Sequence, residues 1–212
     1  MEGWALARRV RAYVALGANV GDAESTLVAA VHALAALPGA SLRGVSRLYR
    51  TAPVGLTDQP PFLNAVVALD VPAGRDPATG ATALLVALKS IERAFGRRDR
   101  GRWGPRELDL DVLVFGGARL AIDRPREGRS RGAAVDPARA ARLLEVPHRD
   151  APDRLFVLAP LADLAPRLVP PGWTERVDTA RKRREAVEGR DAARPVGEWT
   201  GDRWGRTPSA GS

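Results

Sequence analysis

The chain has 212 residues, 45% of them apolar, which suits one domain with a sizeable core. It has no cysteine and only two histidines, which excludes disulfides, Cys-based zinc sites and multi-histidine metal cages and leaves oxygen ligands, as Mg²⁺ prefers, for any metal. The formal charge of +8 indicates anionic partners such as nucleic acid or phosphorylated small molecules, unless an arginine-rich genome accounts for it.

Hydrophobic periodicity and turn residues divide the first half of the chain into strands and helices. In chain order we expect a strand at 10–19, a helix at 23–37, a strand at 41–50, a proline-rich loop at 51–61, a strand at 62–70, a helix from the N-cap Asp76 to Gly96, an arginine-rich loop at 97–106 and a strand at 108–115. This β-α-β-β-α-β order predicts an α+β, ferredoxin-like core. Its antiparallel sheet carries both helices on one face and leaves the other face for an active site.

Two later segments differ in composition. Residues 123–142 are rich in Arg, Ala, Gly and Pro and have almost no large apolar side chain, which predicts a mobile insertion. Residues 175–212 carry many charges and end in Gly, Pro and Ser, which predicts a charged C-terminal tail that is partly helical or disordered.

Asp109 and Asp111 are the sharpest candidates for chemistry. Residues i and i+2 of a strand share a face, so the two carboxylates lie on one side, about 7 Å apart. The opposite, core side is formed by Leu108, Leu110, Val112 and Val114. Such a pair suits one or two Mg²⁺ ions that bridge to phosphates. An exposed polar strand face is the alternative for these residues taken alone.

The segment from Arg97 to Arg106 precedes the carboxylates and contains five arginines in ten residues. Beside a carboxylate pair, a loop of this kind can hold a polyphosphate while the metal neutralises the remaining charge. A solvated basic loop, or a set of Arg–Asp ion pairs without a ligand, is the alternative interpretation.

The strand at 62–70 gives an independent indication. Phe62 and Asn64 share one face, whereas the apolar residues at 63, 65, 67 and 69 form the natural core face. An aromatic plane beside an amide is what a flat, hydrogen-bonding heterocycle needs. Alternatively, the loop at 51–61 covers Phe62, and Asn64 bonds to the backbone of that loop.

Several separate motifs, in order, resemble the 6-hydroxymethyl-7,8-dihydropterin pyrophosphokinase family. They are Ala15-Leu16-Gly17-Ala18-Asn19, Tyr49-Arg50-Thr51-Ala52-Pro53, Asp58-Gln59-Pro60 with Phe62-Leu63-Asn64-Ala65, Ile91-Glu92, Arg102-Trp103-Gly104-Pro105-Arg106 with Leu108-Asp109-Leu110-Asp111, Val146-Pro147-His148 and Pro160-Leu161. The resemblance covers residues 11–172 apart from the insertion. It implies an ATP-dependent enzyme of folate synthesis that transfers pyrophosphate to the hydroxymethyl group of a reduced pterin and releases AMP.

The resemblance also implies roles for individual residues. Asp109 and Asp111 would hold two Mg²⁺ ions, and Arg97 and Arg106 would act with them in catalysis. On the pterin side, Asn64 and the backbone around Thr51 and Val54 would bond the heterocycle, with Phe62 and Phe156 on its two faces. The ATP side would be lined by Lys89, Glu92, Arg97, Arg102, Trp103, Arg106, His148 and Arg154. Lys89 departs from the family pattern, in which glutamine is expected, and Arg149 stands where an aromatic residue is common.

A nucleic-acid-binding module without catalysis is the rival, because a ferredoxin-like sheet with an exposed Phe and a basic charge suits RNA recognition. Such a module needs an aromatic motif on a central strand, where this chain has Leu-Asp-Leu-Asp, and the two carboxylates would repel a phosphodiester backbone. We therefore expect small-molecule substrates and no specific nucleic acid. Because the chain has no apolar run of about 20 residues and no signal peptide, we also expect a cytoplasmic protein without membrane contact. We further expect a monomer, although no sequence feature bears on the oligomeric state.

Overall fold

The computed structural model describes residues 8–53, 58–96, 105–125 and 141–206. The main elements, in chain order, are β1 (Arg9–Ala18), α1 (Ala23–Ala35), β2 (Ser41–Val45), β3 (Leu48–Thr51), β4 (Phe62–Pro72), α2 (Pro77–Ala94), β5 (Asp109–Phe115), β6 (Leu120–Asp123), β7 (Arg142–Val146), α4 (Leu155–Leu164), α5 (Val177–Glu188), β8 (Ala193–Trp199) and β9 (Trp204–Arg206). Within these described residues, no helix has the length and apolar character needed to cross a membrane.

Seven of the nine strands described form one antiparallel sheet in the order β5-β1-β4-β3-β8-β9, with β2 also paired to β4, and β6 and β7 form a separate hairpin. The expected strand at 41–50 is two strands, because the chain breaks its register at Ser46 and Arg47. Ser46 nevertheless keeps the break attached to β4: its N–H donates to Val66 O, and its Oγ accepts from Val66 N–H, both at 2.9 Å. The predicted ferredoxin-like core is confirmed.

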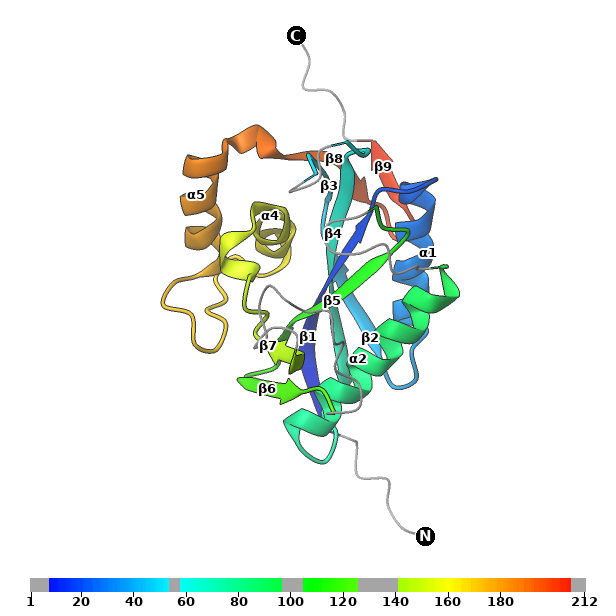
Figure 1. The fold of residues 1–212 in the computed structure, drawn as a ribbon, viewed down its shortest axis with the longest axis vertical. Helices are drawn as coiled ribbons and strands as arrows, with labels where there is room; N and C mark the ends of the chain where they lie inside the picture. The colour runs from blue at the N-terminus through cyan, green and yellow to red at the C-terminus, as the bar shows by residue number, and fades with distance from the viewer. Residues whose placement is uncertain (1–7, 54–57, 97–104, 126–140, 207–212) are drawn as a thin grey trace.

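Helices α1 and α2 cover one face of the sheet (Figure 1). Each begins at an aspartate whose carboxylate caps the helix: Asp22 accepts from Ser25 N–H at 3.0 Å, and Asp76 accepts from Thr79 N–H at 2.8 Å. The apolar side chains of the strands on this face alternate as predicted and are buried against the two helices; they include Val14, Leu16, Ala65, Val67, Leu69, Leu110 and Val112. The two helices on one face are therefore also confirmed.

The opposite face is partly covered by α4 and α5 (Figure 1). Val114 packs with this second cluster, so its predicted place in the α1/α2 core is wrong. The reason is a bulge: Val14 pairs with Val112, but Tyr13 pairs with Val114, which leaves Leu113 as an extra residue in β5. An extra residue reverses the alternation beyond it.

The end of the chain differs from the expected tail. Strand β8 pairs with β3, and β9 pairs with β8, so residues 193–206 extend the main sheet, while α5 supplies the helical part. Trp204 is 4% exposed, and its indole N–H donates to Ser46 O at 2.9 Å. His32 of α1 reaches Asp202 O at 2.8 Å, which attaches the hairpin to α1 as well. This segment is thus part of the fold.

The expected insertion at 123–142 begins and ends in a small hairpin. Strands β6 and β7 pair with each other, and Arg142 bonds to Asp123 at 2.8 Å. Residues 126–140 lie outside the described part of the chain, so their mobility stays a prediction.

Candidate active site

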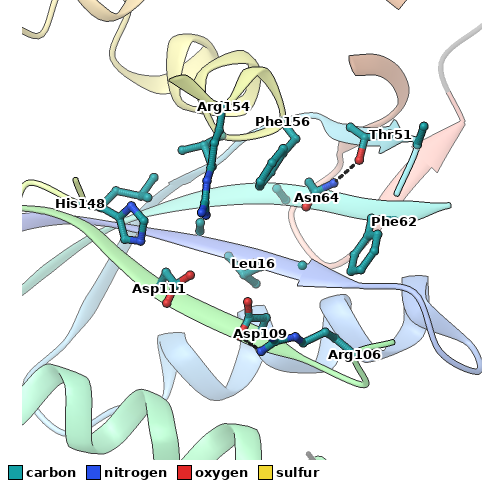
Figure 2. Close-up of a pocket in the computed structure, with 16 residues that line it drawn as sticks. Leu16, Thr51, Phe62, Asn64, Arg106, Asp109, Asp111, His148, Arg154 and Phe156 are labelled. Carbon is teal, nitrogen blue, oxygen red and sulfur yellow. Dashed lines mark hydrogen bonds and ion pairs between the residues drawn. The ribbon is translucent and has the colours of Figure 1, made fainter. Parts of the chain in front are cut away.

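A cavity of about 320 Å³ lies on the sheet face opposite α1 and α2, between the strands and the start of α4 (Figure 2). Its walls come from β1, β3, β4, β5 and the segment from 148 to 157. The lining residues are Ala15, Leu16, Gly17, Thr51, Ala52, Phe62, Asn64, Ala65, Arg106, Asp109, Asp111, Leu113, His148, Arg154, Phe156 and Val157. Nine of them, namely Thr51, Phe62, Asn64, Arg106, Asp109, Asp111, His148, Arg154 and Phe156, are residues that the sequence predicted for the site.

The floor of the cavity is built on two small residues of β1. Gly17 pairs with Asn64 of β4 on one side and with Asp109 of β5 on the other. Ala15 pairs with Asp111 of β5. Because cross-strand partners share a face, the amide and the carboxylates point into one space, with the Cα atoms of Asn64 and Asp109 about 10 Å apart across two strand spacings. A Cβ on Gly17 would come within 3.2 Å of Asn64 Oδ1. Sequence reasoning missed this role, although two small residues at i and i+2 of a predicted strand are its signal.

Asn64 and the two phenylalanines lie toward one end of the cavity (Figure 2). Asn64 is 7% exposed, and its Nδ2 donates to Thr51 Oγ1 at 2.8 Å, which fixes the orientation of the amide. Phe62 comes from the start of β4 and Phe156 from the first turn of α4, so the two rings approach the cavity from different elements. The arrangement offers hydrogen-bonding groups and aromatic surface to a flat heterocycle.

Asp109 and Asp111 lie side by side on β5 and face the same space (Figure 2). Arg106 Nη1 bonds to Asp109 Oδ1 at 3.1 Å, so a cation lies against the carboxylate pair. Further along β5, the bulge turns Leu113 toward the cavity, and Leu113 O accepts from His148 N–H at 2.8 Å. This bond places His148 beside the carboxylates in space, although it is far away in sequence.

His148 and Arg154 bring positive and hydrogen-bond-donating groups to the end of the cavity near Asp111 (Figure 2). Asp150 N–H donates to His148 Nδ1 at 3.3 Å, so the neutral ring carries its proton on Nε2 and can donate from there. Arg154 is held by Asp150 Oδ2 at 2.6 Å, and its guanidinium lies 5.7 Å from the centre of the Phe156 ring. These groups can bind phosphate oxygens.

Glu92 and Lys89 lie outside the lining of the cavity, between α2 and β5. Glu92 is 1% exposed, and its Oε1 accepts from Leu110 N–H at 2.7 Å and from Lys89 Nζ at 2.8 Å. Lys89 Nζ also donates to Leu110 O at 3.2 Å. The two side chains therefore satisfy the backbone of Leu110 on the edge of β5 that faces away from β1, which holds the stretch between the two aspartates in place.

Four residues predicted for the site, Val54, Arg97, Arg102 and Trp103, lie outside the described part of the chain. Their roles stay predictions.

The donor set of the cavity fits magnesium. Among the described residues, no group of three or more histidine, aspartate or glutamate side chains gathers into a complete metal cage. Two carboxylates on one strand face are an incomplete, all-oxygen set, which is what Mg²⁺ uses when phosphate oxygens and water complete its coordination. Asp109 and Asp111 are the residues that would hold it.

A polar clamp that the sequence did not reveal fixes α4 over the sheet. Asp163 of α4 accepts from Arg47 N–H, Nε and Nη2 at 3.1, 3.1 and 2.6 Å, and from Tyr49 Oη at 2.9 Å. Burial, together with the nearby Asp163 carboxylate, raises the pKa of Tyr49. Because α4 carries Phe156, the clamp sets the height of that ring above the strands.

Comparison with known proteins identifies the family that this chain resembles. The pattern of the family described as 7,8-dihydro-6-hydroxymethylpterin-pyrophosphokinase (HPPK) matches residues 13–166. The 2-amino-4-hydroxy-6-hydroxymethyldihydropteridine pyrophosphokinase of Methylorubrum extorquens is 41% identical over 181 residues, which are 84% of this chain and 97% of the relative. The enzyme of the same name from Pseudomonas aeruginosa is 43% identical over 159 residues, 74% of this chain and 82% of the relative.

Solved structures show the same fold. A crystal structure of wild-type Plasmodium falciparum HPPK-DHPS with pteroate superposes with a TM-score of 0.66 at 15% identity, over 94% of this chain and 48% of that one, so this chain spans about half of the solved protein. Together, the family pattern and the relatives above 40% identity show that the chain belongs to the 7,8-dihydro-6-hydroxymethylpterin-pyrophosphokinase family.

Proposed function

We propose that the cavity is the active site in which ATP transfers its terminal pyrophosphoryl group to the hydroxymethyl group of 6-hydroxymethyl-7,8-dihydropterin, giving the pterin diphosphate and AMP for folate synthesis. One observation carries the assignment to this cavity: Asn64, Gly17 and Asp109 stand in a single row across three strands. A heterocycle held at Asn64 and a phosphate chain held at Asp109 therefore meet over Gly17, where the lack of a side chain leaves room for the reacting atoms.

The pterin end is assigned to Thr51, Asn64, Phe62 and Phe156. The pterin ring is flat and has donor and acceptor groups on its edge, which suits a fixed amide between two aromatic side chains. Since Asn64 is already oriented by Thr51, little conformational freedom is lost when the ring binds.

The phosphate end is assigned to Asp109, Asp111, Arg106, His148 and Arg154. In the reaction, the hydroxymethyl oxygen forms a bond to the β-phosphorus and releases its proton to water, the bond from that phosphorus to the α–β bridging oxygen breaks, and AMP leaves with that oxygen. Two Mg²⁺ ions held by the aspartates would neutralise phosphate charge and polarise the reacting oxygens. Arg106, His148 and Arg154 would donate hydrogen bonds to the phosphate oxygens. The side chains of the site therefore act chiefly by positioning the substrates and stabilising charge.

The cavity also argues against nucleic acid as the ligand. The sheet face that an RNA-binding module of this fold would present carries two carboxylates and is partly covered by α4. We propose a monomeric, cytoplasmic enzyme whose partners are the two small-molecule substrates.

AMP release tests the function directly. Purified full-length chain is incubated with ATP and Mg²⁺, with and without the reduced hydroxymethylpterin, and nucleotides are separated by ion-pair chromatography. We expect stoichiometric AMP and pterin diphosphate only when the pterin is present, and loss of both products when EDTA removes the metal. ADP as the main product, or AMP formation that does not depend on the pterin, would contradict the proposal.

A further inference from the structure

Asn19 is a buried polar residue that the proposed reaction does not use. It follows the last residue of β1 and is 4% exposed. It is absent from the described lining of the cavity, so the proposed roles leave it without a contact to either substrate. A buried amide is costly unless it is hydrogen-bonded, so the partners of Asn19 indicate what its burial achieves.

Asn19 makes four hydrogen bonds, to two segments that are far apart in sequence. Its N–H donates to Arg106 O at 3.0 Å, and its Oδ1 accepts from Arg106 N–H at 2.8 Å. Its Nδ2 donates to Gln59 Oε1 and to Pro60 O, both at 3.0 Å. One side chain thus joins the end of β1, the segment that leads into β4 and the segment that leads into β5.

Each of the two joined segments supplies one end of the cavity. Pro60 stands two residues before Phe62, which belongs to the pterin end. Arg106 itself belongs to the phosphate end and bonds to Asp109 at 3.1 Å. Both hydrogens of the Asn19 amide are directed to one segment and its oxygen to the other, so a shift of either segment breaks bonds to Asn19.

We propose that Asn19 is a positioning residue that fixes the separation between the pterin end and the phosphate end of the cavity. The inference rests on the proposed function, because it needs two substrates that react across that separation. Pyrophosphoryl transfer requires the hydroxymethyl oxygen in line with the β-phosphorus, and a misplacement of about 1 Å costs on the order of 10²-fold in rate. Removal of Asn19 therefore affects the reaction between bound substrates more than the binding of either one.

The test compares Asn19→Ala with Ser46→Ala. Ser46 is a matched control because it is 1% exposed and its Oγ bonds to the backbone of Arg47 and of Val66, yet it lies outside the described cavity lining. Initial rates are measured with each substrate varied while the other is saturating, at a temperature at which thermal melts show both variants folded. We expect kcat of Asn19→Ala to fall at least tenfold, with each KM within threefold of the parent, and kcat of Ser46→Ala to stay within twofold.

Asn19→Asp separates the two links and serves if the alanine variant does not fold. A carboxylate keeps an acceptor for Arg106 N–H but has no donor for Pro60 O, so only the pterin end is released. We expect kcat to fall at least fivefold, with each KM within threefold of the parent.

Three outcomes would overturn the inference: unchanged kcat in Asn19→Ala, an equal loss of kcat in Ser46→Ala, or a kcat of Asn19→Asp within twofold of the parent. Failure of the parent to release AMP is a separate result and would contradict the proposed function instead.

Discussion

Strands β1, β4 and β5 have two faces that differ in function: one face packs the core, and the other lines the cavity. Toward α1 and α2, the side chains of β1, β4 and β5 are leucine, valine, alanine and, at the end of β5, Phe115, and nearly all of them are inaccessible to solvent. Toward the cavity, the same strands present Gly17, Asn64, Asp109 and Asp111. Since adjacent residues of a strand alternate between faces, stability and chemistry are separated by one position along the chain. Substitutions at neighbouring residues should therefore have effects of different kinds.

The largest effect is expected for the carboxylates. Asp109→Asn and Asp111→Asn should each lower kcat, with a loss of several kcal/mol of transition-state stabilisation. Asparagine keeps the shape of the side chain but loses the charge that binds Mg²⁺. The two carboxylates repel each other in the metal-free enzyme, so thermal melts of the apo variants should match or slightly exceed the parent. Near-parental turnover at limiting Mg²⁺ would show that the substituted aspartate is not a metal ligand.

Leu110→Ala is the counterpart on the other face, between the two aspartates. Leu110 is fully buried in the core, so its truncation should cost about 2–5 kcal/mol of unfolding free energy, as for other buried leucines. Its backbone bonds to Glu92 and Lys89 are unaffected, so the variant that remains folded should keep more than half of the parental kcat. The measurements are urea unfolding and activity at low temperature. A stable variant that has lost activity would mean that the two faces are not separable at this strand.

The sequence predicted the core face and the cavity face correctly in β4 and incompletely in β5. Strict alternation from Phe62 to Leu69 identified both faces, and the structure confirms them. In β5 the bulge at Leu113 moved Val114 to the other face, because a bulge depends on the pairing partner and leaves no local pattern. Residues 193–206 were missed as strands for a similar reason: their Pro, Gly and charges give weak local signals, and the strands form because β3 offers an open edge.

The candidate site was predictable where side-chain chemistry is distinctive, and less so where it depends on contacts between distant segments. The carboxylate pair, Asn64 and the phenylalanines carry recognisable chemistry. The close approach of Gly17 to Asn64 has only a weak signal, the small residues at 15 and 17 of the predicted strand. The bond between Asn19 and Arg106 joins residues 87 positions apart, and no local pattern reports it. Glu92 was assigned to the ATP side through the family resemblance alone, and the structure places its carboxylate against the backbone of Leu110.

A smaller effect is expected for the aromatic rings at the pterin end. Phe62→Ala and Phe156→Ala should each weaken pterin binding by about 1–3 kcal/mol, the usual scale for stacking of a base-like ring. Binding of a non-hydrolysable ATP analogue should change much less, because both rings are assigned to the other substrate. Calorimetric titration of each ligand on folded protein measures the two values. Equal losses for both ligands would contradict the assignment of the rings to the pterin.

The smallest effect is expected at the clamp that joins the two halves of the cavity wall, where Tyr49 of β3 donates to Asp163 of α4 at 2.9 Å. Tyr49→Phe removes this hydrogen bond and leaves the packing of the ring, so it should cost about 1 kcal/mol at pH 7. The pKa of Tyr49 is raised in the folded protein, so the folded state holds the phenolic proton more tightly than the unfolded chain. This contribution is complete below the unfolded pKa of about 10 and is lost as the pH rises above it. Urea unfolding of parent and variant is measured between pH 7 and 11. The unfolding free energy of the parent should fall more steeply than that of the variant above about pH 10. If the two free energies change in parallel with pH, the hydroxyl gains nothing from its burial against Asp163.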